Sequence, residues 1–173
     1  MNIEYIYLQI YRLFDKVTPI SADCGKLCGK RCCKGKDSGM YLFPGEERVY
    51  RLLSPNWTEI EKSDFSYKFD GKEKSVPILF CKGTCDRYQR PLACRIFPLT
   101  PYINDSGKTE IIIDPRAKSI CPLAKTLSVS DFDRKFVRNV KRAFSLLGKN
   151  KEISEYLRKY SEYMDEYKKF FEE

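Results

Sequence analysis

The chain has 173 residues, of which 42% are hydrophobic and 32% charged, and its formal net charge is +8. This length suits one domain, residues 1–173, which can bury a core without disulfides. No segment approaches the roughly 20 apolar residues of a membrane helix, and the first 17 residues lack the apolar run of a signal peptide. We therefore expect a cytoplasmic protein with no membrane partner, whose thiols stay reduced.

The N-terminal half of the sequence predicts two helices and two hairpins. Apolar residues recur at intervals of three and four over residues 2–17, which indicates an amphipathic helix. Residues 44–53 predict a short helix with Glu46 and Glu47 in its first turn, where the helix dipole favours anions. Weak alternation over residues 64–81 predicts a hairpin around "DGKEKS". A second hairpin is expected across "NDSG", joining residues 99–103 to residues 109–113.

The last third of the chain predicts a helical hairpin over about 130–172. Ser130 and Asp133 resemble a capping box, and Gly148 ends the first helix. The second helix is expected over about 151–171, where the spacing of its tyrosines fits core packing better than a ligand-stacking platform. The predicted fold class is α+β. It has a small antiparallel sheet or hairpins and Cys-rich metal-binding loops, flanked by an N-terminal helix and a C-terminal helical hairpin.

Cysteine clustering is the main functional signal. The eight thiols occur at Cys24, Cys28, Cys32, Cys33, Cys81, Cys85, Cys94 and Cys121. In a reducing compartment this clustering favours metal binding over a disulfide framework. Zinc takes four thiolates in a tetrahedral site, and an iron–sulfur cluster commonly takes four cysteines. Eight thiols therefore divide into two four-thiolate sites, or into one cluster and four thiols with other roles.

The spacing of the cysteines does not select the metal. Bacterial ferredoxins and zinc ribbons both favour two residues between paired ligands, whereas three residues separate most of the clustered cysteines here. Zinc is preferred, with iron or an iron–sulfur cluster as the alternative. Adjacent cysteines usually point apart, so Cys32 and Cys33 could serve different metals, or one metal and the core.

Cations and prolines accompany both cysteine blocks. The cations are Lys26, Lys30, Arg31, Lys34, Lys36, Lys82, Arg87, Arg90 and Arg95. A neighbouring cation lowers the pKa of a thiol and helps to ionise it. Arg90 and Arg95 are the candidates for hydrogen bonds to ligand sulfurs, and pairing with carboxylates is their alternative role. Prolines on both sides of Cys94 stiffen the chain, so we expect a preorganised ligand whose thiolate these two arginines favour.

The order of these residues resembles the cysteine-cluster family of zinc- or iron-chelating proteins, of the YkgJ type. The first block matches its Cys-rich segment ending in Cys-Cys, and Cys121 supplies the eighth cysteine. The second block matches at Cys81, Cys85, Tyr88, Arg90, Pro91, Cys94, Arg95, Phe97 and Pro98. The resemblance covers roughly residues 24–125 and implies a metal-binding region there. A related cluster occurs in flagellin lysine-N-methylases, but this chain lacks a glycine-rich strand–loop–helix for a methyl donor.

Three functions are compatible with the sequence. The preferred one is a metal-binding cysteine-cluster protein that holds zinc or iron for a structural role or for metal handling. The second is an iron–sulfur redox or enzyme component, and the third is a nucleic-acid-binding zinc module. The third is not favoured, because eight thiolates and two Zn²⁺ ions lower the net charge to about +4. No catalytic residue is predicted, since the chain has neither histidine nor a catalytic dyad, and no protein partner is identified.

Overall fold

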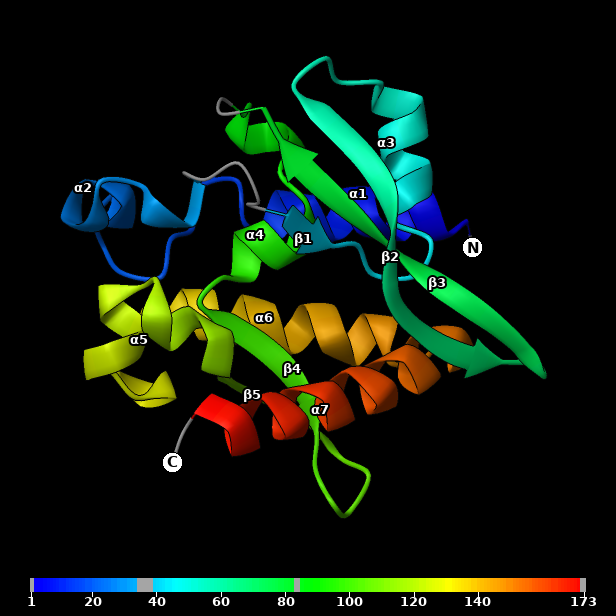
Figure 1. Cartoon of the computed structure of the whole chain (residues 1–173). Coiled ribbons are helices and arrows are strands. Elements are labelled where there is room, and N and C mark those ends of the chain that lie inside the picture. The colour runs from blue at the N-terminus through cyan, green and yellow to red at the C-terminus, as the bar shows by residue number, and fades with distance from the viewer. Residues whose placement is uncertain (1, 34–38, 83–84, 172–173) are drawn as a thin grey trace.

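A computed structural model describes residues 2–33, 39–82 and 85–171. Predicted features elsewhere, including Lys34, Lys36 and residue 172, lie outside these ranges. The α+β class is confirmed, with helices at both ends and two small antiparallel sheets between them (Figure 1). The elements are α1 (Ile3–Leu13), α2 (Cys24–Cys28), η1 (Arg31–Cys33), β1 (Gly39–Tyr41), α3 (Glu47–Leu53), β2 (Thr58–Phe69), β3 (Lys72–Cys81), η2 (Arg87–Gln89), α4 (Leu92–Ile96), β4 (Leu99–Ile103), β5 (Thr109–Ile113), η3 (Pro115–Ser119), α5 (Pro122–Thr126), η4 (Val129–Asp131), α6 (Arg134–Leu147) and α7 (Lys151–Phe171).

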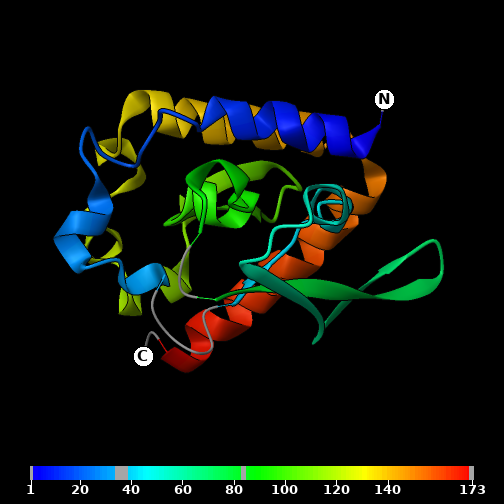
Figure 2. The ribbon, with the colours of Figure 1, turned by 90° about the horizontal axis from the view of Figure 1, so that it is seen from above.

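Helix α1 lies along α6 (Figure 2), although the two are at opposite ends of the sequence. The rings of Phe14 and Phe136 meet edge to face with centroids 6.3 Å apart. The Asn139 side-chain amide donates to the carbonyl oxygen of Leu13 at 2.7 Å and thereby satisfies a free acceptor at the end of α1. The predicted N-terminal helix is confirmed, but it ends at Leu13 rather than residue 17.

The first sheet has the strand order β1-β3-β2, and β1 was not predicted. Asp70 and Gly71 form the tip of the β2–β3 hairpin with positive φ angles of 50° and 71°, as a two-residue turn requires. The predicted six-residue turn is therefore too long, because Lys72 already pairs with Phe69. Strand β2 also begins six residues earlier than predicted, at Thr58.

The second sheet is the predicted hairpin. Strands β4 and β5 pair antiparallel over Leu99–Ile103 and Thr109–Ile113. The side-chain oxygen of Asn104 accepts from the backbone N–H groups of Ser106 and Lys108 and so closes the turn.

The two C-terminal helices are confirmed, and Gly148 ends α6 as predicted, but the predicted capping box at Ser130 and Asp133 is wrong. The capping box lies at Ser128 and Asp131, ahead of η4, while Asp133 caps α6 by accepting from the Phe136 N–H at 2.9 Å. Helices α6 and α7 diverge from their shared turn in Figure 2, with α4 and β4 between them. The predicted stripe of α7 is core at Ile153, Leu157, Tyr160 and Met164, which are at most 5% exposed, whereas Tyr167 is half-buried. In the described part of the chain, no helix combines the length and apolar character needed to cross a bilayer.

Candidate metal centre

All eight cysteines line one cavity of about 360 Å³. They come from segments far apart in the sequence: α2 and η1, the end of β3, residue 85, α4 and the residue before α5. Figures 1 and 2 both place α2 beside α5, whereas α4 lies in the middle of the molecule. Apolar side chains such as Phe14 and Trp57 also line the cavity, together with Arg31, Arg87 and Arg90. The fold thus brings together thiols whose positions span residues 24–121.

The first cysteine block is helical rather than a loop. Asp23 caps α2 by accepting from the Gly25 N–H at 3.1 Å, and Gly29 ends the helix with φ 59°. Cys24 and Cys28 are therefore one turn apart on the same helix. The glycines of this block terminate and shape a short helix instead of leaving the segment without regular structure.

Cys32 and Cys33 do not point apart, contrary to the prediction. Their sulfur atoms are 3.9 Å apart, and two sulfurs on one tetrahedral zinc ion would be about 3.8 Å apart, given Zn–S bonds of about 2.3 Å. The pKa of Cys33 is lowered to about 6, first by the hydrogen bond from Cys32 and then by the charges of Arg90 and Lys30. The pKa of Cys32 is raised, because its proton is held in that bond. Cys33 is therefore the thiol of this pair that ionises more readily.

Cys94 differs from the prediction in its electrostatics. It lies on α4 facing the cavity, and burial raises the pKa of its thiol above the ordinary value, with the neighbouring thiols of Cys33 and Cys85 acting in the same direction. Arg90 lowers this pKa but does not offset the burial. The Arg90 Nε atom instead donates to the Cys85 sulfur at 3.0 Å. The Cys94 thiolate thus needs a further cation, and a bound metal is the strongest such partner.

Arg95 also lines the cavity, but its guanidinium group is held by α1 and by the chain at η2. Its guanidinium lies 4.3 Å from the centroid of the Tyr11 ring and is also 3.4 Å from the Asp15 carboxylate. It donates to the carbonyl oxygens of Tyr11, Tyr88 and Arg90 at 3.1, 2.5 and 2.6 Å. These bonds join α4 to α1, to η2 and to the residue that follows η2. Arg95 therefore supports the scaffold around Cys94. Its pairing with Asp15 matches the alternative role expected from the sequence, which was pairing with a carboxylate.

Glu46 lies at the start of α3, as predicted, and it also has a structural role that its position in the sequence does not indicate. It is fully buried, and its carboxylate accepts from the Tyr11 hydroxyl at 2.5 Å, the Leu92 N–H at 2.6 Å and the Phe43 N–H at 3.1 Å. Pro91, the residue before α4, offers no side-chain cap, so Glu46 satisfies the start of the helix that carries Cys94. Burial raises the pKa of Glu46 to about 7 despite these bonds and the nearby charge of Arg95. Its main partners lie 35 and 46 residues away along the chain, where no local pattern identifies them.

The thiols of the cavity are suitable metal donors, but the sulfur atoms are too far apart in this structure to hold a metal together. Within residues 2–33, 39–82 and 85–171, no three Cys, Asp or Glu side chains are close enough to hold a metal ion. Thiols that share one cavity, with arginines beside them, fit a thiolate metal by chemical type. Binding would require the sulfur atoms to move closer together.

No known protein family, curated protein or solved structure matches this chain significantly. The resemblance to the cysteine-cluster family therefore stays a prediction made from the motif.

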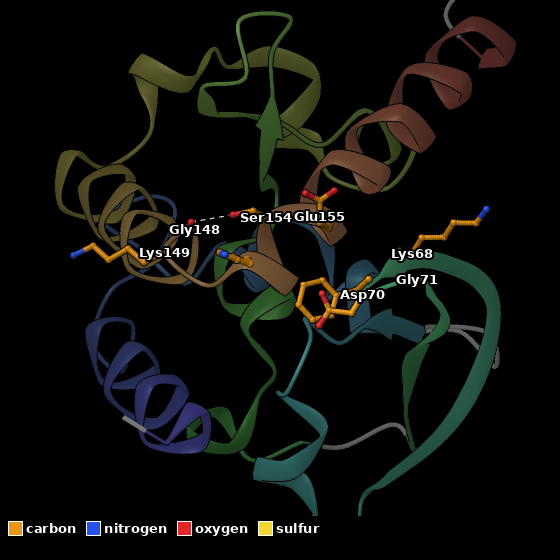
Figure 3. Close-up of a pocket in the computed structure, with 9 residues that line it drawn as sticks. Lys68, Asp70, Gly71, Gly148, Lys149, Ser154 and Glu155 are labelled. Atoms are coloured by element: carbon orange, nitrogen blue, oxygen red, sulfur yellow. Dashed lines mark hydrogen bonds between the residues drawn. The ribbon is translucent and has the colours of Figure 1, made fainter.

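A second hollow, of about 430 Å³, lies between the β2–β3 tip and the turn from α6 to α7 (Figure 3). The side chains of Lys68 and Lys149 extend away from each other in Figure 3. The hydrogen bond drawn there joins the Ser154 hydroxyl to the Gly148 carbonyl oxygen and serves the turn itself. These polar groups do not converge on a common point, as the polar groups of a ligand site would.

Proposed function

We propose that this protein binds metal, preferably zinc, through cysteine thiolates in the cavity. The observation that carries the proposal is that all eight cysteines line the same cavity although they are distributed over nearly 100 positions of the chain. Unrelated buried cysteines would be scattered among several parts of the core. The role of the metal is structural or metal handling, and an iron–sulfur cluster is the alternative cofactor.

The charges around the cavity support the same proposal. Arg31, Arg87 and Arg90 line it together with the thiols. Cations beside thiols favour the ionised form that metals bind. Arg90 also bonds to the Cys85 sulfur directly, as residues that orient metal ligands commonly do.

The neighbours of the thiols suggest how they divide between two metals. After burial, the groups that most raise the pKa of Cys24 are the thiols of Cys121 and Cys28, which lie on the side of α2 and α5. The corresponding neighbours of Cys94 are Cys33 and Cys85. The Cys32 sulfur is 3.9 Å from that of Cys33, and its further neighbours are the thiols of Cys28 and Cys24. The two sets therefore meet at the Cys32–Cys33 pair.

The test is metal content with a count of reactive thiols. The protein is purified without oxygen, analysed for zinc and iron, and scanned for visible absorption. Native and unfolded samples are then titrated with a thiol reagent. We expect zinc, no colour and protected thiols in the native state, whereas a brown protein with iron would favour the cluster. A protein without either metal, whose eight thiols all react in the native state, would rule the proposal out.

A further inference from the structure

The outer face of α6 carries charge of one sign only. The helix reads "RKFVRNVKRAFSLL" and contains five cations and no acidic residue: Arg134, Lys135, Arg138, Lys141 and Arg142. The neighbouring helix α7, of 21 residues, contains five cations and five acidic residues. The excess of positive charge is therefore specific to α6 and not a general property of the C-terminal helices.

These five cations form a single stripe. At 3.6 residues per turn they fall within an arc of about 120°, and at 1.5 Å per residue they span about 12 Å along the axis. All five are exposed. The opposite side of α6 is core, because Phe136, Val140, Ala143, Phe144 and Leu147 are at most 1% exposed.

The stripe is not neutralised by the protein itself. In the described part of the chain, none of the five cations has a carboxylate oxygen within 4.0 Å. On α7, by contrast, Arg158 pairs with Glu155 and Lys159 pairs with Glu162. The cations of α6 are thus available to a partner, whereas those of α7 are partly satisfied within their own helix.

This arrangement costs the helix stability. Arg134 and Arg138, and likewise Arg138 and Arg142, are like charges four residues apart, which destabilises a helix by about 0.2–0.5 kcal/mol per pair. Arg134 and Lys135 also lie in the first turn, where the helix dipole disfavours cations. Folding alone gives no reason for this pattern, so an external ligand is the better explanation.

We propose that the outer face of α6 binds the phosphate backbone of a nucleic acid. In a duplex the phosphates of one strand are spaced about 3.4 Å apart along the helix axis, so a stripe of about 12 Å covers the axial length of three or four of them. Three of the five cations are arginines, whose planar guanidinium groups pair with phosphate oxygens in bidentate fashion. An interfacial membrane helix would instead bury an apolar face in lipid, and the apolar face of α6 is already in the core. The proposal is independent of the metal centre.

The test variant replaces Arg138, Lys141 and Arg142 by glutamine. Its control replaces Arg158, Lys159 and Lys169 on α7 by glutamine, which lowers the net charge by the same three units at positions that are also exposed. Both are compared with the unmodified chain, as isolated, by fluorescence anisotropy. The probes are a labelled 20-bp DNA duplex, an RNA duplex and a single-stranded RNA, between 50 and 200 mM KCl.

We expect the unmodified chain to bind at least one probe with an affinity that falls steeply with salt. The α6 variant should lose at least about tenfold in affinity at 100 mM KCl, and its slope of log affinity against log salt should be shallower by about 3. The α7 control variant should keep the affinity and the salt slope of the unmodified chain. Circular dichroism should show the variant folded, because the substitutions only remove repulsion. If it unfolds, the single variants Lys141→Gln and Arg142→Gln, each with an expected slope change of about 1, replace it.

Two results would overturn the proposal. One is the absence of salt-dependent binding to all three probes, including the case in which the protein binds only vesicles of anionic lipid. The other is a control that loses as much affinity as the α6 variant, which would show that net charge rather than this face governs binding. Neither result depends on whether the cavity holds a metal.

Discussion

Replacing Glu46 by glutamine should remove a pH dependence from the stability of the fold. The Glu46 carboxyl is fully buried, and its pKa is raised from 4.5 to about 7 in the folded protein. Between these two values the folded state binds more protons than the unfolded state, so the free energy of unfolding falls as pH rises. The stabilising contribution of the protonated Glu46 carboxyl to the free energy of unfolding is fully present below pH 4.5 and lost above pH 7. The change amounts to about 3 kcal/mol. Glutamine cannot ionise and should show none of it.

The groups that face Glu46 do not titrate in this pH range. Tyr11 and Tyr50 both have a raised pKa, and so does the Cys94 thiol, so all three stay protonated. Arg95 keeps its positive charge throughout. Other groups of the chain, such as Cys33, titrate in both proteins alike and cancel when the two stabilities are subtracted. The difference between the unmodified chain and Glu46→Gln therefore reports Glu46 itself.

The assay is urea unfolding at four pH values from 4.5 to 7.5, followed by circular dichroism with chelator and reductant present. Chelator keeps metal binding out of the comparison. Glu47→Gln is the matched control, because Glu47 is the next residue and its carboxylate faces the more exposed Arg48 and Arg51. A stability difference between the unmodified chain and Glu46→Gln that stays constant within about 0.5 kcal/mol over this range would refute the reasoning. An opposite slope would mean that the hydrogen bonds to Glu46 outweigh its burial.

Three further predictions concern the proposed metal. Removing it with a strong chelator should lower the melting midpoint by roughly 10 °C, because a ligand at 1,000 times its dissociation constant contributes about 4 kcal/mol; an unchanged midpoint after confirmed metal loss would contradict this. Cys94→Ser should lose more metal per chain than Cys24→Ser, since Cys94 lies on a helix whose start is anchored by a buried carboxylate, whereas Cys24 begins a five-residue helix near the surface. Full metal in Cys94→Ser with loss in Cys24→Ser would reverse that ranking. Arg90→Ala should weaken metal binding by about 10-fold or more through the loss of its bond to Cys85, measured by competition with a zinc indicator; an unchanged affinity would remove Arg90 from the site.

The elements that the sequence predicts well are those with a local cause. The β4–β5 hairpin was predicted residue for residue, because its strands and its "NDSG" turn are adjacent in the chain. The long helix α7 was predicted within a residue, since its apolar residues repeat over more than five turns. Strand β1 was missed, as three residues are too few to show a period and depend on pairing with β3.

The sequence predicts which cysteines belong to the candidate site, but it does not predict the contacts of the charged residues around them. The clustering of cysteines marked the residues that line the cavity, since that signal lies in the sequence itself. The roles of Arg95 and Glu46 depend on contacts with α1, dozens of positions away. Arg95 stands over the ring of Tyr11, and Glu46, which lies at the start of α3 as predicted, also holds the start of α4. Burial, which decides both cases, cannot be read from neighbouring residues alone.

The packing of α1 against α6 has a consequence for how the chain folds during its synthesis. The bond between Asn139 and Leu13 joins positions 126 residues apart. At 5–20 residues per second, α1 leaves the ribosome roughly 6–25 seconds before its partner helix. During that interval Tyr7, Ile10 and Phe14, which are at most 2% exposed in the finished fold, have no α6 to cover them. The apolar face of α1 is therefore exposed to non-native contacts until α6 docks.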